Sequence, residues 1–189
     1  NPGGKIDIGG GVYRSKWEPL TNDSSLRPFE GYEITQNSPR TISFQGVLEN
    51  RDYLRDANDP LIYYPEAAFP GQYIFANPYT AAIDITKLSF GEATEATVYL
   101  YNTGSYGDWV TAGNGTTGAS AGQYVAIPKD LLKGEVENPT IPSGLPREIP
   151  SMQGFLVKKL TGETSPELFT LEILYNTVIT KSSTAQRSP

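Results

Sequence analysis

The sequence predicts an all-β fold, an antiparallel β-sandwich of the jelly-roll type with at most one or two short helices. Three observations lead to this prediction: short runs of alternating apolar and polar residues, glycine and proline between those runs, and few stretches of helical period. The 189 residues include 19 Gly and 15 Pro, which end strands and form turns. Many short strands separated in this way are typical of sandwiches.

The predicted strands are the runs with a period of two, which gives each strand one apolar and one more polar face. In the run 40–49, for example, Ile42, Phe44 and Leu48 alternate with polar neighbours. In chain order, the predicted strands are 31–36, 40–49, 72–76, 95–101, 106–111, 123–127, 154–159 and 167–175.

Two short stretches carry helical signals, and each follows a proline, which favours the first turn of a helix. The stretch 79–88 follows Pro78, and the stretch 129–133 follows Pro128. Both are too short to form a layer, so the helices are expected at the margins of the sandwich.

The length of the chain is typical of one domain. We expect a single β-sandwich module over 1–189, with its core at about 28–180. The ends, 1–11 and 181–189, are expected to be loose or to lead into neighbouring domains of a larger protein. Since the chain begins with NPGGKIDIGGG and its first residue is not Met, we expect it to be a processed or truncated piece.

The composition argues against several classes of function. The chain has no His and no Cys, so it lacks the commonest general base, the usual zinc ligands and a Ser-His-Asp triad. The net charge is −6 and the basic residues are scattered, so we expect no nucleic-acid partner. No run approaches the ~20 apolar residues of a membrane helix, so we expect no direct membrane insertion. These exclusions favour a protein that is not an enzyme.

A cluster of oxygen ligands is the candidate metal site. Asp56, Asn58 and Asp59 lie together in RDYLRDANDP, and carboxylate and amide oxygens are ligands that Ca²⁺ prefers. The spacing does not match an EF-hand, and Asn-Asp-Pro is also an ordinary turn sequence. We therefore expect no cofactor, with Ca²⁺ at these three residues as the alternative.

Aromatic residues in two predicted loops form the candidate ligand site. Tyr106 and Trp109 lie in NTGSYGDWV, and Tyr63 and Tyr64 precede Pro65. Aromatic rings with polar tips are common at binding surfaces, and a carbohydrate-binding module is the alternative function. The same residue types also favour strands, so packing in the core is the competing interpretation for Trp109.

A glycan-active enzyme that uses only carboxylates is a further alternative. Such an enzyme needs two acids placed on either side of the glycosidic bond. Glu92 with Glu95, or Asp84 with Asp108, would provide such a pair. No motif in the sequence selects either pair.

Several segments, in order, resemble an all-β module found in large secreted and surface proteins of the Bacteroidetes. The segment GQYIFANPYTAAIDI, 71–85, is similar to a GNPYPSxIDW-like motif of that family. VYLYNTGSYGDWV and IPSMQGFLVKK resemble two later family segments, and 28–50 resembles the opening strand pair. The matching positions of the first motif are Gly71, Asn77, Pro78, Tyr79, Ile83 and Asp84; the departures are Tyr73 for Trp, Ala76 for Gly, Thr80 for Pro and Ile85 for Trp.

The resemblance implies an exported module, often type IX-secreted and mostly of unknown function, and it implies no reaction. We therefore expect a non-catalytic structural or adhesive module at an extracellular or outer-membrane surface. Its expected partners are neighbouring domains of the same polypeptide and a surface protein or a glycan.

The chemistry of the first motif indicates a scaffold. Asn77 precedes Pro78 and is therefore pushed out of the helical region, so a strand must end there. Tyr79 and Ile83 are expected to fold back onto the core, and Asp84 to accept backbone N–H bonds in the turn that follows.

Overall fold

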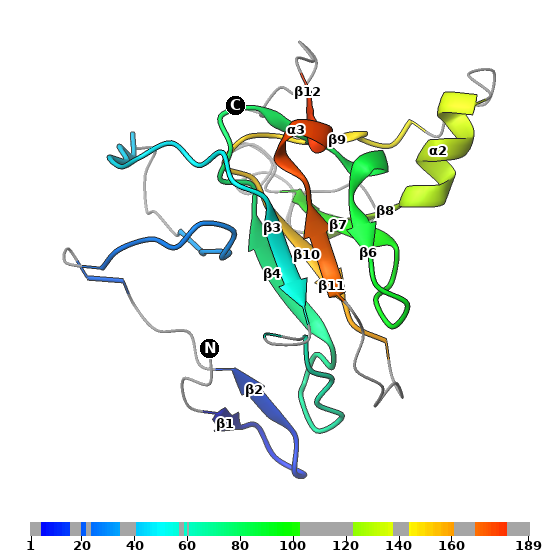
Figure 1. Ribbon diagram of the computed structural model, residues 1–189. Helices are drawn as coiled ribbons and strands as arrows, with labels where there is room; N and C mark the ends of the chain where they lie inside the picture. Colours follow the sequence, from blue (N-terminus) through cyan, green and yellow to red (C-terminus); the bar gives the residue numbers. More distant parts are fainter. Residues whose placement is uncertain are drawn as a thin grey trace, which may run out of the picture.

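The computed structural model confirms the all-β class, with antiparallel sheets and short helices at the margins (Figure 1). It describes residues 5–15, 20–21, 24–34, 41–56, 59, 61–102, 123–137, 144–160 and 169–180. The strands are β1 (Lys5–Asp7), β2 (Tyr13–Ser15), β3 (Tyr53–Asp56), β4 (Gln72–Ala76), β5 (Ala82–Asp84), β6 (Ser89–Phe90), β7 (Thr97–Asn102), β8 (Gln123–Pro128), β9 (Glu148–Ile149), β10 (Gly154–Lys158), β11 (Phe169–Ile173) and β12 (Ile179–Thr180). In the described part they form sheets of order β1-β2, β4-β10-β7-β8, β3-β11-β6 and β12-β5-β9.

The four-stranded sheet has an apolar row that follows from its register. Phe155 of β10 lies opposite Phe75 of β4 and opposite Leu100 of β7. Leu100 in turn lies opposite Val125 of β8. Opposite residues share one face of a sheet, and all four pack into the hydrophobic core.

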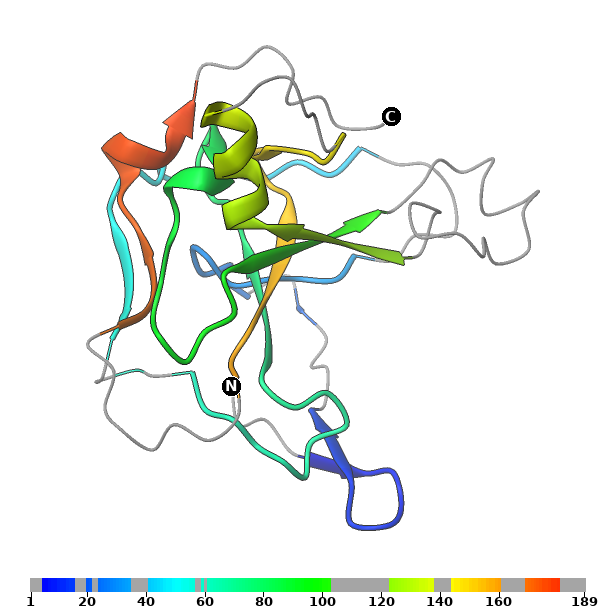
Figure 2. The same ribbon diagram turned by 90° about the vertical axis from the view of Figure 1, so that its right-hand side faces the viewer.

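The core lies between this sheet and the sheet β3-β11-β6, which Figure 2 shows as two layers. One apolar cluster joins Phe155 and Val157 of β10 to Leu171 and Ile173 of β11, and all four side chains are buried. Two sheets packed over a shared core form a sandwich. Full burial of one such side chain contributes about 1.5–3 kcal/mol, so this cluster is the main source of stability.

The small sheet β12-β5-β9 and the helices close the upper end of the sandwich (Figure 1). The helical segments are η1 (Ile85–Lys87, a 3₁₀ turn), α2 (Lys129–Glu137) and α3 (Tyr175–Val178). Leu132 of α2 is buried in the core. Lys129, at the start of α2, donates from Nζ to the carbonyl oxygen of Leu88, which holds the helix against the end of η1. None of the described helices is long and apolar enough to cross a membrane.

Five strand predictions are confirmed. The prediction 72–76 coincides with β4, and β7, β8, β10 and β11 lie within two residues of the predicted bounds. In 31–36, residues 31–34 form no strand, although Glu30 makes an isolated bridge with Phe75. The prediction 106–111 lies outside the described residues.

The predicted strand 40–49 is wrong over its described residues, 41–49. Residues 41–48, which we call the arm, are exposed and make no hydrogen bond with the described residues. The apolar alternation is present, but a strand also needs a partner strand for its backbone groups, and none of the described strands lies against the arm.

The predicted helix 79–88 is also wrong, because this stretch contains β5 followed by η1. The backbone of β5 pairs on one side with β12 and on the other with β9, and these tertiary pairings override the helical signal. The helix predicted at 129–133 is present and continues to Glu137 as α2.

The first eleven residues contain part of a β-hairpin. The segment expected to be loose at 1–11 contains β1, which pairs with β2 in a hairpin. Gly9, Gly10 and Gly11 all have positive φ between these strands, a conformation that glycine adopts without steric cost. The other end, 181–189, lies outside the described residues.

Candidate functional site

The predicted aromatic residues do not all lie in the described part of the chain. Tyr106 and Trp109 are outside it, in the connection between β7 and β8. Tyr64 is exposed, whereas Tyr63 is half-buried, and a Cβ on Gly71 would lie 2.9 Å from the Tyr63 ring. Tyr63 therefore packs against the turn before β4, and Tyr64 is the more exposed residue of the pair.

The segment that carries these two tyrosines is held by Tyr73 of β4. The Tyr73 hydroxyl donates to the carbonyl oxygen of Ile62 at 2.6 Å and accepts from the N–H of Ile62 at 2.7 Å. Burial raises the pKa of Tyr73, so its hydroxyl keeps its proton. The Tyr73 hydroxyl thus has a structural role.

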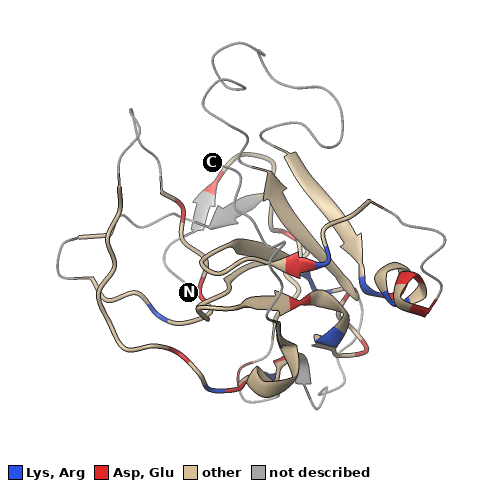
Figure 3. Ribbon diagram, turned by 90° about the horizontal axis from the view of Figure 1, so that it is seen from above, with Lys and Arg blue, Asp and Glu red and all other residues tan. Residues whose placement is uncertain are grey.

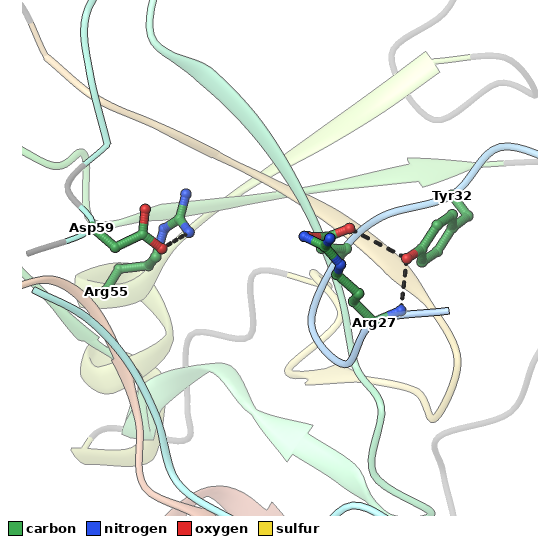
Figure 4. A network of polar contacts seen from close by, with 5 residues as sticks. Arg27, Tyr32, Arg55 and Asp59 are labelled. Atoms are coloured by element: carbon green, nitrogen blue, oxygen red, sulfur yellow. Dashed lines mark hydrogen bonds and ion pairs between the residues drawn. The ribbon is translucent and has the colours of Figure 1, made fainter. Parts of the chain in front are cut away.

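The predicted calcium ligands are only partly described. Asp56 ends β3, the backbone N–H of Asp59 donates to the carbonyl oxygen of Asp56 at 3.2 Å, and Asn58 lies outside the described residues. The Asp59 carboxylate forms an ion pair with Arg55 (Figure 4). Figure 4 also shows the hydrogen bond from the Arg27 backbone N–H to the Tyr32 hydroxyl. Within the described ranges no group of three or more His, Cys, Asp or Glu could hold a metal ion. Calcium binding at these three residues therefore stays a prediction.

Of the acids considered for catalysis, Glu95 and Asp84 make hydrogen bonds within the fold. Glu95 accepts from the Tyr99 hydroxyl at 2.8 Å, and burial raises the pKa of Tyr99 to about 12. Asp108 lies outside the described residues, and Glu92 is exposed.

Asp84 caps the η1 turn. Its Oδ1 accepts from the backbone N–H of Thr86 at 2.9 Å, and its Oδ2 pairs with the Arg147 guanidinium at 2.9 Å. Burial raises the pKa of Asp84, but the hydrogen bonds from Arg147 and Thr86 outweigh burial and leave this pKa below its ordinary value. A general acid needs a raised pKa, so Asp84 suits a structural role, as its place in the motif predicted.

A buried asparagine joins the two family-like motifs at 71–85 and 149–159. The Asn77 amide nitrogen donates to the carbonyl oxygens of Ala81 at 2.9 Å, Ile149 at 2.9 Å and Pro150 at 3.1 Å. Its Oδ1 accepts from the backbone N–H of Tyr79 at 2.9 Å. Asn77 has no exposed surface, so these bonds satisfy a polar group that burial would otherwise make costly.

The backbone of the same asparagine continues the junction. The Asn77 N–H donates to the carbonyl oxygen of Gln153, and the Met152 N–H donates to the Asn77 carbonyl oxygen at 2.9 Å. Met152 has a φ of 62°, which is uncommon for a residue other than glycine. The strain is local to the turn that brings the second motif against the first.

Tyr79 ties this junction to the chain segment before β3. Its ring is fully buried and lies edge-on to Phe29 and Tyr175, with centroids 5.4 and 4.9 Å away. Its hydroxyl donates to the carbonyl oxygen of Arg51 at 2.7 Å, and burial raises its pKa. The expectation that Tyr79 and Ile83 fold onto the core is confirmed, since both have no exposed surface.

One pair of neighbouring aromatic residues was not predicted from the sequence. Tyr101 of β7 and Tyr124 of β8 are cross-strand partners on the face away from the core, with ring centroids 5.1 Å apart. Tyr124 is 46% exposed. Both lie where the chain enters and leaves the 103–122 connection that carries Trp109. The signal was present in the alternation around each tyrosine, but the pairing of the two strands brings the rings together.

Figure 3 shows acidic and basic residues interspersed along the described segments. The arm and β8, by contrast, contain no Asp, Glu, Lys or Arg.

The chain resembles a known surface protein over most of its length. It is 36% identical over 173 residues to the minor fimbrium subunit Mfa5 of Porphyromonas gingivalis, a member of the Bacteroidetes. The alignment covers 87% of this chain and 13% of the relative, so the chain spans about an eighth of that protein's length. No family model and no solved structure matches the chain.

Proposed function

We propose that the chain is a non-catalytic structural module of a bacterial surface protein that takes part in a fimbrium or a similar fibre. The observation that carries this proposal is the 36% identity to a fimbrium subunit over 173 residues. At this level of identity the two segments share a fold, and the module is then one of several units in a longer polypeptide.

The polar side chains of the first motif bond to other parts of the fold, which supports the proposal. Asn77, Asp84 and Tyr79 direct their polar groups to backbone or side-chain partners in the fold. Asn77 links the end of β4 to β9 of the small sheet β12-β5-β9, and Tyr79 links the same region to the segment before β3. A module built to transmit load or to hold a shape needs such junctions, whereas a catalytic site needs polar groups aimed at a substrate.

The cell surface is the location that follows from this proposal, on the outer membrane or outside it. Its partners are then neighbouring domains of the same polypeptide and other components of the fibre.

Immunogold electron microscopy on the bacterium that encodes the chain tests the proposal. Antibodies raised against the purified module should label fibres on intact cells and in sheared surface fractions. Labelling that requires permeabilised cells would contradict a surface role. Turnover of glycan or peptide substrates by the purified chain would contradict a non-catalytic one.

A carbohydrate-binding module is the second candidate, and the Tyr101–Tyr124 pair favours it. The two rings lie 5.1 Å apart beside the connection that carries Tyr106 and Trp109, and exposed aromatic residues are common anchors in binding sites. A glycan-array screen with Tyr124→Ala and Trp109→Ala, with and without Ca²⁺, tests this candidate. Binding that both folded variants lose would support it, and a blank array would leave the structural role alone.

A further inference from the structure

Tyr101 and Tyr124 form a close pair of phenol rings on the outer face of the sheet β4-β10-β7-β8. The two residues are direct partners in the antiparallel ladder of β7 and β8, which Figure 2 shows side by side in green and yellow-green. Their ring centroids are 5.1 Å apart, with 58° between the ring planes, and this distance is typical of aromatic rings in contact. The pairing of the strands therefore holds the two rings against each other.

Solvent reaches this pair. Tyr124 is 46% exposed, and Tyr101 is half-buried. β8 is the last strand of its sheet, and of the described strands only β7 pairs with it. A diffusible oxidant can therefore reach the phenols from the open side of the sheet.

The phenols keep their protons until they are oxidised. A tyrosine hydroxyl is protonated at neutral pH, and burial, the neighbouring Tyr101 and the Glu33 carboxylate raise the pKa of Tyr124. Removal of an electron from such a phenol also releases its proton and leaves a phenoxyl radical. The unpaired electron lies partly on the ring carbons next to the C–O group, and two radicals held together join at these carbons.

We propose that Tyr101 and Tyr124 are a site of oxidative cross-linking, at which a haem peroxidase with hydrogen peroxide joins the two rings as dityrosine. Each phenol gives up one electron and its hydroxyl proton, and a carbon–carbon bond forms between the ring carbons next to the two C–O groups. The hydrogen on each joined carbon then moves to the neighbouring oxygen, which restores both phenols. Hydrogen peroxide takes up the two electrons and two protons and leaves as two molecules of water. This inference goes beyond the proposed function, because the chain is here the substrate of an oxidation.

The cross-link connects β7 and β8 covalently across the connection 103–122. Since the chain has no Cys, a disulfide cannot serve this purpose. A covalent bond that closes a loop stabilises a fold mainly by restricting the unfolded chain. β8 has one partner strand in the described sheet, whereas β7 and β10 have two each, so the edge strand gains most from the bond.

A second tyrosine pair provides an internal comparison. Tyr79 and Tyr175 have ring centroids 4.9 Å apart, so distance alone favours a cross-link there as well. Tyr79, however, has no exposed surface, and its hydroxyl donates to the carbonyl oxygen of Arg51. An oxidant in solution does not reach this phenol in the folded chain, so we expect the reaction at Tyr101 and Tyr124 alone of these two pairs.

Treatment of the dilute full chain with a haem peroxidase and hydrogen peroxide tests the site. We expect a monomer that has the fluorescence of dityrosine and has lost the mass of two hydrogen atoms. The product is then denatured and cut on the N-terminal side of its aspartates. Asp108 lies between the two tyrosines in the sequence, so the peptides on either side of it should stay joined, and their fragment masses locate the bond.

Phenylalanine variants identify the reacting residues. Tyr101→Phe and Tyr124→Phe should each abolish the cross-linked monomer, because each removes one hydroxyl and keeps the ring. Circular dichroism checks that both variants are folded. Tyr64→Phe is the matched control, since Tyr64 is 43% exposed on another segment, and this variant should give as much cross-linked monomer as the parent chain.

The stability of the product tests the purpose of the bond. The cross-linked chain should unfold at a higher urea concentration than the untreated chain, whereas Tyr124→Phe should gain nothing from the same treatment. An unchanged midpoint in the cross-linked chain would overturn the stabilising role.

Three other results would overturn the site itself. One is dityrosine that appears only in covalent dimers, with a yield that rises with protein concentration. Another is a bond that maps to a different pair, such as Tyr79 with Tyr175 or Tyr106 with Tyr124. The third is a cross-linked monomer that still forms when Tyr101 or Tyr124 is replaced by phenylalanine.

Discussion

At the scale of single residues, Asn77 shows how one side chain can hold distant segments together. Its amide group bonds to residues 4, 72 and 73 positions away in the chain, through the carbonyl oxygens of Ala81, Ile149 and Pro150. An asparagine side chain carries its donors on Nδ2 and its acceptor on Oδ1, both bonded to Cγ, so it can satisfy carbonyl groups on one side and the Tyr79 N–H on the other. No apolar residue of similar size could do both.

Replacing Asn77 should therefore strongly destabilise the fold. Asn77→Ala leaves three carbonyl oxygens and one N–H without this partner in a buried place, and we expect a loss of about 3 kcal/mol or more. Asn77→Asp keeps the acceptor but faces the carbonyls with a carboxylate, so it should be at least as harmful. Urea unfolding followed by circular dichroism measures both. Asn50→Ala, at an exposed asparagine, is the control and should change stability little.

The Glu49–Arg51 pair predicts a response to acid. The hydrogen bond from Arg51 lowers the pKa of Glu49 from 4.5 to about 2. Since the folded-state pKa is the lower one, the pair stabilises the fold above about pH 4.5, and this stabilisation is lost as the pH falls toward 2. Glu49→Gln should flatten the dependence of unfolding free energy on pH within this window.

Urea titrations at several pH values, at low and high salt, measure this effect. The effect should be smaller at high salt, because the Arg51 side chain is 77% exposed and the pair is screened. Glu137→Gln, at an exposed position at the end of α2, serves as the control. If the unfolding free energy depends on pH equally in Glu49→Gln and in the parent chain, the Glu49–Arg51 pair does not stabilise the fold.

At the scale of elements, the strand pair β4-β10 depends on a turn that only glycine fits. Gly71 precedes β4 with a φ of 70°, and its carbonyl oxygen accepts from the Lys159 N–H at 2.7 Å. A Cβ at this position would lie 2.2 Å from the Lys159 carbonyl oxygen. The close approach of the two backbones is therefore what brings β4 and the end of β10 together.

Gly71→Ala should destabilise the fold by about 2 kcal/mol or more, because the left-handed backbone and the steric clash both oppose it. Gly46→Ala is a matched control in the arm. A Cβ on Gly46 meets nothing within 4 Å and its φ is not positive, so the change should stay within about 0.5 kcal/mol. Thermal unfolding of the two variants gives the comparison. Similar losses for both would mean that the Gly71 turn is not a constraint.

At the scale of the whole molecule, stability is distributed unevenly. β10 lies between β4 and β7 in the largest sheet, and Phe155, Leu156 and Val157 are all buried. The hairpin β1-β2 has contacts mainly within itself, and residues 7–12 are exposed. Local opening costs least where few apolar contacts are lost.

Hydrogen exchange should follow this distribution. Amides of β10 should exchange slowest, at a rate set by global unfolding, and those of β1 and β2 should exchange early. Arm amides 41–48 should exchange almost without protection in dilute solution.

The sequence by itself determined the fold class and all four strands of the sheet β4-β10-β7-β8. Strands such as β4 and β8 follow from side-chain alternation and flanking turn residues, which are local properties. The scaffold role of Asn77 and Asp84 could also be predicted, because Asn-Pro ends a strand and Asp caps a turn.

The tertiary structure alone decided which alternating segments became strands and which side chains meet. The segments 41–48 and 72–76 show similar alternation, yet among the described strands only the second has partners. A strand exists only when its backbone groups are paired. The Tyr101–Tyr124 pair and the bonds of Asn77 to residues 149 and 150 likewise depend on strand order. Strand order is set by contacts between residues far apart in the chain, and local periodicity carries no information about it.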